Sequence, residues 1–292
     1  MEKNNWIEFQ SELEKLHRNA RSSQGKIFDQ MRERCKIKLP VLISDLHAAD
    51  PSNPAFCGVS LLRVLGGTGL QETAHTRTLA WIFDPNKNDE HKLGEEIFVD
   101  SLIPWIQSHP SKSKVNFPPG DYSVRNVRAE RHTGTDRKGR IDLWIDGTAK
   151  VDGVDRVWLV IIEAKVEAEL SNHQLGYYED AAKAWKKLHK KNALNPCFIY
   201  LKDGRKADGN AKWIPLDFDT LVELIWEAVP TPCKTEPFSD GLYLVRLYLA
   251  GVLSDVVGWE LPIRASVGDA VNYSMFDYVQ NLHQKVKVSG HL

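Results

Sequence analysis

The sequence predicts an α/β fold in which helices flank a mixed central β-sheet, with helical additions at both ends of the chain. Two observations carry this prediction. Segments with strand and helix patterns follow one another in the order strand, strand, strand, helix, strand after an opening helix. With 292 residues, the chain is also long enough to bury a sizeable core.

The first third of the chain is mostly helical in pattern. Near the N-terminus, apolar residues recur at three- and four-residue steps, the period of an amphipathic helix: Trp6, Phe9, Leu13 and Leu16. Residues 59–85 and 94–106 give two further helix-like segments. The GGTG run at 66–69 lacks the Lys-Ser or Lys-Thr pair of a phosphate-binding loop, so we interpret it as a turn.

Strand patterns begin after a loop that contains proline and serine. Two segments alternate apolar and polar residues, a third is continuously apolar, and a fourth is a short apolar run; these are residues 122–130, 140–146, 156–165 and 195–201. One long helix, over about 171–191, connects the last two. Helical period returns at 241–257 and 274–286. We therefore expect a helical N-terminal extension, a core, and a C-terminal helical part packed on that core, at residues 1–70, 71–205 and 206–292.

Composition restricts the function classes. Lys and Arg number 38 and Asp and Glu 39, a net charge of -1, so any basic surface for nucleic acid must be local. The four cysteines lack zinc-ligand spacing and are interpreted as reduced core thiols: Cys35, Cys57, Cys197 and Cys233. No signal peptide and no apolar run of about 18 residues is evident, so we expect a cytoplasmic protein without membrane contact.

Charged residues stand at the ends of two adjacent strand candidates. Asp142 lies near the start of the second, and Glu163 and Lys165 share a face at the end of the third, which is apolar on both faces. Such a strand is central and covered, so its charged end must emerge at a sheet edge or cleft. Taken singly, each residue could simply be solvated where a strand leaves the sheet.

Together, these residues match the needs of a metal-dependent phosphodiester hydrolase. Carboxylates on adjacent strands can hold a divalent cation through hard oxygen ligands, and the Ala164 carbonyl can add a third ligand. A lysine beside them can orient or deprotonate water and offset charge that builds on a phosphate. The following helix has one inward stripe that is apolar except at its head: Gln174, Tyr178, Ala181, Trp185 and Leu188. Gln174 therefore points toward Glu163, or else only completes a capping box with Ser171.

This combination resembles the PD-(D/E)xK nuclease superfamily. The resemblance rests on Asp142, on Glu163-Ala-Lys165 closing an apolar strand, and on Gln174-Leu-Gly-Tyr-Tyr178 in a helix. It implies a restriction-endonuclease-like core, metal binding by Asp142 and Glu163, a catalytic role for Lys165 and a supporting role for Gln174. The resemblance covers about Gln71 to Leu201, and Ile141 replaces the proline of the named motif without removing a ligand.

Residues 71–94 are similar to the upstream helix and loop of a bacterial subgroup of this superfamily. The resemblance makes Glu72 an additional acidic member of the catalytic and metal-binding set. Glu130, at the end of the first strand, competes for this role. His75 on the same helix either touches substrate or packs in the core. Six cations precede Asp142 in residues 125–140, and we expect substrate contacts from Arg77, Arg131, Arg140 and Tyr178. For Arg77 the alternative is an ion pair with a neighbouring acid.

The resulting hypothesis is a Mg²⁺-dependent endonuclease, with Mn²⁺ as a substitute, that hydrolyses phosphodiester bonds in DNA. Analogy with bacterial relatives suggests restriction or phage defence. One alternative is an inactive nuclease-like module that binds nucleic acid or protein, and another is an RNA nuclease. The sequence leaves open a homodimer or a defence-system partner protein, and it does not give the cleavage specificity.

Overall fold

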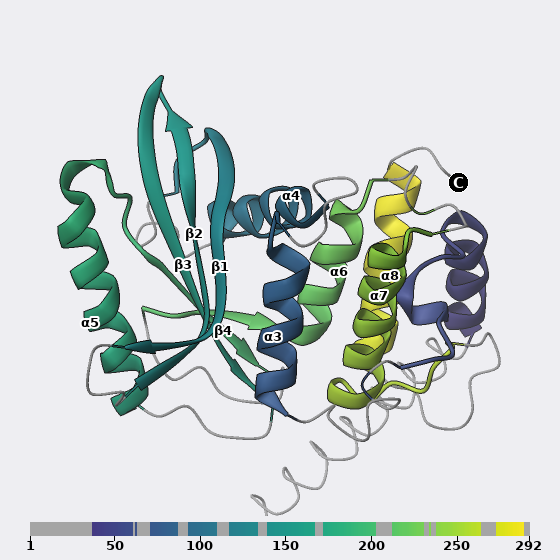
Figure 1. The fold of residues 1–292 in the computed structure, drawn as a ribbon. Helices are drawn as coiled ribbons and strands as arrows, with labels where there is room; N and C mark the ends of the chain where they lie inside the picture. Colours follow the sequence, from purple (N-terminus) through teal and green to yellow (C-terminus); the bar gives the residue numbers. More distant parts are fainter. Residues whose placement is uncertain are drawn as a thin grey trace, which may run out of the picture. The chain divides into compact units, whose positions relative to one another are not determined.

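A computed structural model gives the fold (Figure 1). It describes residues 37–60, 62, 71–86, 93–109, 117–133, 139–166, 172–202, 212–230, 234, 238–263 and 273–288. The chain divides into two compact units. One comprises Met1–Pro51 and Ile263–Leu292, and the other comprises Ser52–Pro262.

The larger unit is built on a mixed five-stranded sheet with the strand order β1-β2-β3-β4-β5. The first three strands are antiparallel, whereas β4 pairs with β3 and β5 pairs with β4 in parallel. The strands are β1 (Asp121–Thr133), β2 (Gly139–Val151), β3 (Val154–Lys165), β4 (Cys197–Lys202) and β5 (Ile214–Asp217). The predicted α/β fold with a mixed central sheet is therefore confirmed.

Helices cover both faces of this sheet. Figure 1 shows α5 (Asn172–His189) on one side of the strands, and α3, α4 and α6 on the other. The last three span Glu72–Phe83, Leu93–Ser108 and Phe218–Ala228. On the α5 side, Tyr178 packs with Leu159 and Ile161 of β3. On the other side, Trp158 of β3 stacks on Phe98 of α4 at 5.5 Å between ring centroids. Because β3 is covered on both faces, its apolar run needs no alternation.

Two connections fix the register of β3. Asp152 and Gly153 join β2 to β3, and both have a positive φ, at 50° and 76°. Two such residues form the tight turn whose twist matches antiparallel strands, and the Asp-Gly pair favours it. At its other end, β3 is followed by α5, which carries the chain back so that β4 lies parallel to β3.

The four predicted strands and the long helix are present, and the sheet gains a fifth strand. β5 and α6 were not predicted, since β5 has only four residues and includes Pro215. The inward stripe of α5 is Leu175, Tyr178, Ala182 and Trp185. Leu188, which we expected on this stripe, is 78% exposed. The prediction failed there because the helix turns His189 rather than Leu188 toward Trp185, with 4.8 Å between the two ring centroids.

Among the described residues, the larger unit also has helices that are short or follow the sheet. They include η1 (Pro54–Phe56), η4 (Lys190–Asn192), α7 (Asp240–Gly251) and a π-helical turn, η6 (Val252–Val256). Cys57 and Cys197 are buried free thiols, as predicted. Cys35, Cys233 and the GGTG run lie outside the described residues.

The smaller unit contains a helix over residues 37–49 and α8 (Tyr273–Val288). His283 of α8 contacts Asp45 of the other helix, with 2.9 Å between Nε2 and Oδ2. The amphipathic helix predicted near Trp6 lies outside the described residues. In the part of the chain that the structure describes, no helix has the length and apolar character needed to cross a bilayer.

The close approach of β1, β2 and β3 at Gly147 gives a test of the packing. A Cβ at this position would lie 2.0 Å from the carbonyl oxygen of Ser123 and 2.5 Å from the ring of Trp158. We therefore expect Gly147→Ala to lower the free energy of unfolding by roughly 1–3 kcal/mol, as overpacking does. Urea denaturation measures this change.

Gly176 in α5 is the matched control, because a Cβ there meets no atom within 4 Å. Gly176→Ala should raise the free energy of unfolding by up to about 1 kcal/mol, since alanine favours the helix. Equal effects of the two substitutions would contradict the described packing of β2.

Candidate active site

The site lies where β2 and β3 stop pairing. Their ladder ends at Leu143 opposite Ile162, and the next opposite residues in this register are Asp142 and Glu163. Opposite residues of an antiparallel pair point to the same face, so the two carboxylates are delivered to one side of the sheet. Oδ2 of Asp142 accepts a hydrogen bond from the Ala164 amide at 3.1 Å. This bond fixes the Asp142 side chain against β3 beyond the end of the ladder.

The ammonium group of Lys165 lies close to three acidic side chains. Its Nζ lies 2.6 Å from Oε1 of Glu163, 3.0 Å from Oε2 of Glu72 and 3.9 Å from Oδ2 of Asp142. Glu72 comes from the first residue of α3, 93 positions earlier in the chain than Lys165. We call these four residues the carboxylate cluster. Two strand ends and a helix N-terminus therefore converge on one charged centre.

Burial makes Glu163 the most perturbed acid of the cluster. Its side chain is fully buried, and neither carboxylate oxygen accepts a well-formed hydrogen bond from the described residues, although Oε1 lies close to Lys165. Burial and the neighbouring Asp142 raise the pKa of Glu163 to about 8, against the opposing effect of Lys165. Burial likewise raises the pKa of Asp142, although Glu163 and Lys165 oppose the rise. The two carboxyl groups are therefore poised to share a proton.

The pKa of the Lys165 ammonium group is also raised, which for a lysine favours the charged form. Burial lowers the pKa of its ammonium group, but the charges of Glu163 and Asp142 and the hydrogen bond to Glu72 more than offset this. The net result is a pKa above the ordinary value. Lys165 is therefore a cation in this arrangement, and it acts as a hydrogen-bond donor rather than a proton acceptor.

The donor chemistry of the cluster fits a divalent cation. Three carboxylates surround one ammonium group, so two negative charges have no counter-charge within the cluster when all groups are ionised. Hard carboxylate oxygens are the ligands that Mg²⁺ and Mn²⁺ prefer. Among the described residues, however, no three acidic, histidine or cysteine side chains already stand as a metal-ligand group. In this arrangement the acids contact the Lys165 ammonium group instead.

The comparison with known families decides the classification. A sequence model of the PD-(D/E)XK nuclease superfamily matches residues 61–241, which is more than half of the chain. The chain belongs to this superfamily. No curated protein and no solved structure matches it significantly. Membership of the PD-(D/E)XK superfamily suggests nuclease activity and a nucleic-acid substrate, and the matched residues contain the whole carboxylate cluster.

The structure separates the two acids that competed for the additional role in this PD-(D/E)XK site. Glu72 contacts Lys165, whereas Glu130 lies 2.7 Å from Nη1 of Arg140 and accepts a hydrogen bond from Thr76 at 3.3 Å. Glu130 also has a positive φ of 58°, which is unfavourable for a non-glycine residue. Glu72 therefore lies in the carboxylate cluster, whereas Glu130 pairs with Arg140 outside it.

The other predicted site residues lie outside the carboxylate cluster as the structure describes it. Gln174 lies in the first turn of α5, and its side chain is outside the described set. Arg77 is exposed on α3. The guanidinium of Arg131 lies 3.9 Å from the ring centroid of Trp144. Arg140 is half exposed and pairs with Glu130. These placements leave Arg77, Arg131 and Arg140 as candidates for substrate contact.

Tyr178 does not fit the predicted contact with substrate. It is fully buried in the core, and its hydroxyl donates a hydrogen bond to the backbone carbonyl of Arg140. Its place in the apolar stripe of α5, which the sequence already showed, accounts for this burial. The geometry gives it a structural part, holding the start of β2 close to α5. His75 is also fully buried, with Nδ1 at 3.1 Å from the Tyr248 hydroxyl, so it packs in the core.

The sequence analysis missed a second lysine at this end of the sheet. Lys202 stands directly opposite Lys165 in the parallel β3–β4 ladder and is 6% exposed. Opposite residues in a parallel pair share a face, with strands about 4.8 Å apart. The available signal was a short apolar run that ends in lysine, as β3 does. Lys202 therefore adds positive charge beside the carboxylate cluster.

The raised pKa of Glu163 makes the stability of the metal-free protein depend on pH. Between its ordinary value of 4.5 and about 8, the unfolded chain loses the Glu163 proton first, so stability falls as pH rises. Glu163→Gln cannot ionise. As pH rises across that window, we expect the free energy of unfolding of Glu163→Gln to increase relative to that of wild type by up to about 1.4 kcal/mol per pH unit.

Urea denaturation in EDTA from pH 5 to pH 8.5 measures this trend. The exposed Asp180, which pairs with Lys183, provides the control substitution Asp180→Asn. Parallel stability curves for wild type and Glu163→Gln would show that Glu163 ionises freely and would contradict its described burial.

Proposed function

We propose that the chain is a divalent-metal-dependent endonuclease that hydrolyses phosphodiester bonds in DNA. The observation that carries the proposal is the convergence of Glu72, Asp142 and Glu163 on the ammonium group of Lys165. This arrangement supplies acidic ligands and a cation at one place, which are the groups that phosphodiester hydrolysis needs. The superfamily match supports the same reaction class.

Asp142 and Glu163 are the proposed ligands of Mg²⁺ or Mn²⁺, with Glu72 as the additional acid. The Ala164 carbonyl is a further proposed ligand, because the amide of the same residue already faces Asp142. In an extended strand the N–H and C=O of one residue point to the same side. The chemistry that such an ion supplies when bound is Lewis acidity toward a phosphoryl oxygen and a lower pKa for water.

Lys165 is proposed to stabilise negative charge on the phosphate during hydrolysis. Its raised pKa keeps it protonated, which favours this role over that of a general base. Glu163 and Glu72 contact its ammonium group, which keeps Lys165 beside the proposed metal ligands. Gln174 is the proposed partner that orients Lys165 or the attacking water from the first turn of α5.

The test is cleavage of plasmid DNA and of single-stranded DNA with Mg²⁺ or Mn²⁺. Wild type should nick or linearise the plasmid. Asp142→Ala removes a metal ligand and Lys165→Ala removes the cation, so each should lower the cleavage rate by about 10²-fold or more. Lys187→Gln is the control, because Lys187 is exposed and precedes the C-terminus of α5.

Three outcomes separate the alternatives. Equal cleavage by all variants would refute the mechanism. Nucleic-acid binding without cleavage and without divalent-ion binding would identify an inactive interaction module instead. Faster cleavage of a matched RNA than of DNA would reassign the substrate. We further propose a cytoplasmic role in restriction or phage defence, by analogy with bacterial members of the superfamily. Plaque counts on cells that express wild type or Asp142→Ala would test that role.

A further inference from the structure

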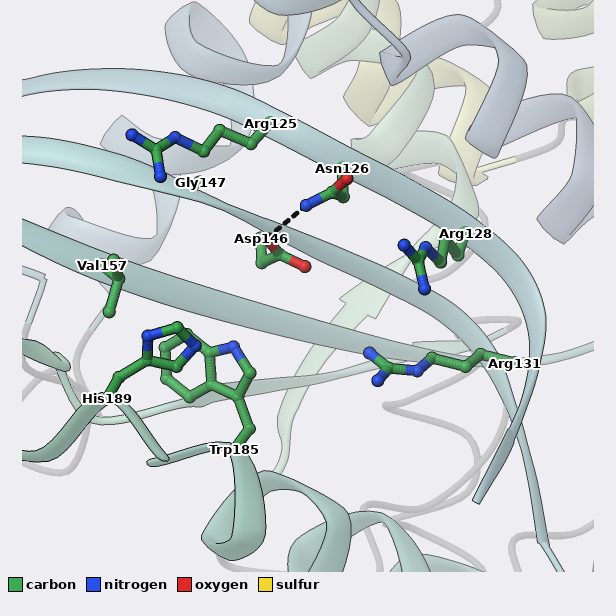
Figure 2. A pocket seen from close by; sticks show the side chains of 9 residues that line it. All are labelled: Arg125, Asn126, Arg128, Arg131, Asp146, Gly147, Val157, Trp185 and His189. Carbon is green, nitrogen blue, oxygen red and sulfur yellow. Dashed lines mark hydrogen bonds between the residues drawn. The ribbon is translucent and has the colours of Figure 1, made fainter. Parts of the chain in front are cut away.

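A second charged feature lies on the α5 side of the sheet, further along β2 from the strand ends that carry the carboxylate cluster. It is a hollow of about 280 Å³ whose lining includes Arg125, Arg128, Arg131, Asp146, Trp185 and His189. Figure 2 shows the three arginines along β1, with Trp185 and His189 of α5 on the opposite side. We call it the arginine hollow.

The backbone of β1 departs twice from regular strand geometry to build this lining. In a regular strand, Arg128 would face away from both Arg125 and Arg131, because residues three apart point to opposite faces. A bulge between Val124 and Asn126 shifts the register at Arg125. The left-handed backbone of Glu130 then turns the strand before Arg131. Bulges often re-aim side chains beside functional sites, and both irregularities flank Arg128.

The positive charge of the hollow is poorly compensated. Within the described residues, no carboxylate forms an ion pair with the exposed Arg125 or Arg128. Burial and the charge of Arg128 lower the pKa of Arg131, whereas the charge of Asp146 opposes this. The carboxylate of Asp146 is already held by other donors, namely Asn126 at 2.9 Å and the Trp144 indole at 2.7 Å. The guanidinium groups are therefore left to bind an external anion.

We propose that the arginine hollow is a subsite for the phosphate backbone of the nucleic acid that the carboxylate cluster cleaves. This inference rests on the proposed function of that cluster. Asp142 and Asp146 lie four residues apart on the same side of β2, roughly 13 Å at the rise of a strand. The subsite therefore holds phosphates that flank the scissile bond rather than the scissile phosphate. Guanidinium groups suit this task because they bind phosphate oxygens in a bidentate manner.

The experiment measures binding of labelled DNA, as duplex and as single strand, to the full chain in EDTA, where no cleavage occurs. The double variant Arg125→Gln/Arg128→Gln should bind about tenfold more weakly than wild type. The slope of log Kd against log salt should also fall by about one for each phosphate that the variant no longer binds. Arg125→Lys/Arg128→Lys should restore most of the affinity. Circular dichroism checks that each variant is folded.

Lys187→Gln is the matched control. It removes one positive charge from α5, but Lys187 is two positions from Trp185 and so faces away from the hollow. Its affinity should stay within about twofold of wild type. If the control weakens binding as much as the double variant does, net charge alone explains the effect and the subsite is overturned.

Failure of this inference can be told apart from failure of the proposed function. Cleavage by wild type together with unchanged binding by the arginine double variant overturns the subsite and leaves the nuclease intact. Weakened binding by the double variant, with no cleavage by wild type, supports the subsite and refutes the nuclease. Polyglutamate that competes with DNA at equal charge concentration would show a general polyanion site and would overturn the assignment to nucleic acid.

Discussion

The interaction on which the site depends is the contact of one buried ammonium group with three carboxylates. Lys165 is 6% exposed at its side chain and Glu163 is fully buried, so each would be costly to ionise alone. Pairing offsets this cost only partly, because the acids outnumber the cation within the carboxylate cluster. Burial first, and then the charge of Asp142, raise the pKa of Glu163 despite the opposing charge of Lys165. A divalent cation would correct the imbalance of charge, which links the burial of these groups directly to the proposed chemistry.

The central acids could be predicted because they obey local rules. Alternation put Glu163 and Lys165 on one face of β3, Asp142 stood near the start of the adjacent strand, and the apolar run of β3 implied that its charged end emerges at an edge. The register of the β2–β3 ladder, which places Asp142 opposite Glu163, came only from the structure. Glu72 was reached only through the family resemblance, since no local pattern shows that the start of α3 lies beside a strand 93 positions later. Tyr178 was assigned to substrate because its place in a motif was given more weight than its place in the apolar stripe.

The arginine hollow shows a second limit of sequence reasoning. Strict alternation separates Arg128 from Arg125 and Arg131, and only a bulge and the left-handed Glu130 bring all three to one side. Neither the bulge nor the left-handed position contains a glycine or proline, so nothing in the sequence signals that β1 is irregular there. The two features also explain how a chain with a net charge of -1 could approach a polyanion. The carboxylate cluster repels phosphate, whereas the arginines on the same side of the sheet attract it.

The most direct test of the central claim is a crystal structure of the protein soaked in Mn²⁺, with the ion located by its anomalous scattering. We expect one Mn²⁺ about 2.0 to 2.6 Å from carboxylate oxygens of Asp142 and Glu163, with the Lys165 ammonium displaced from between them. An unchanged contact between Lys165 and Glu163, with no ion at this position at millimolar Mn²⁺, would contradict the account. The cluster would then be a closed ion-pair network that serves stability alone.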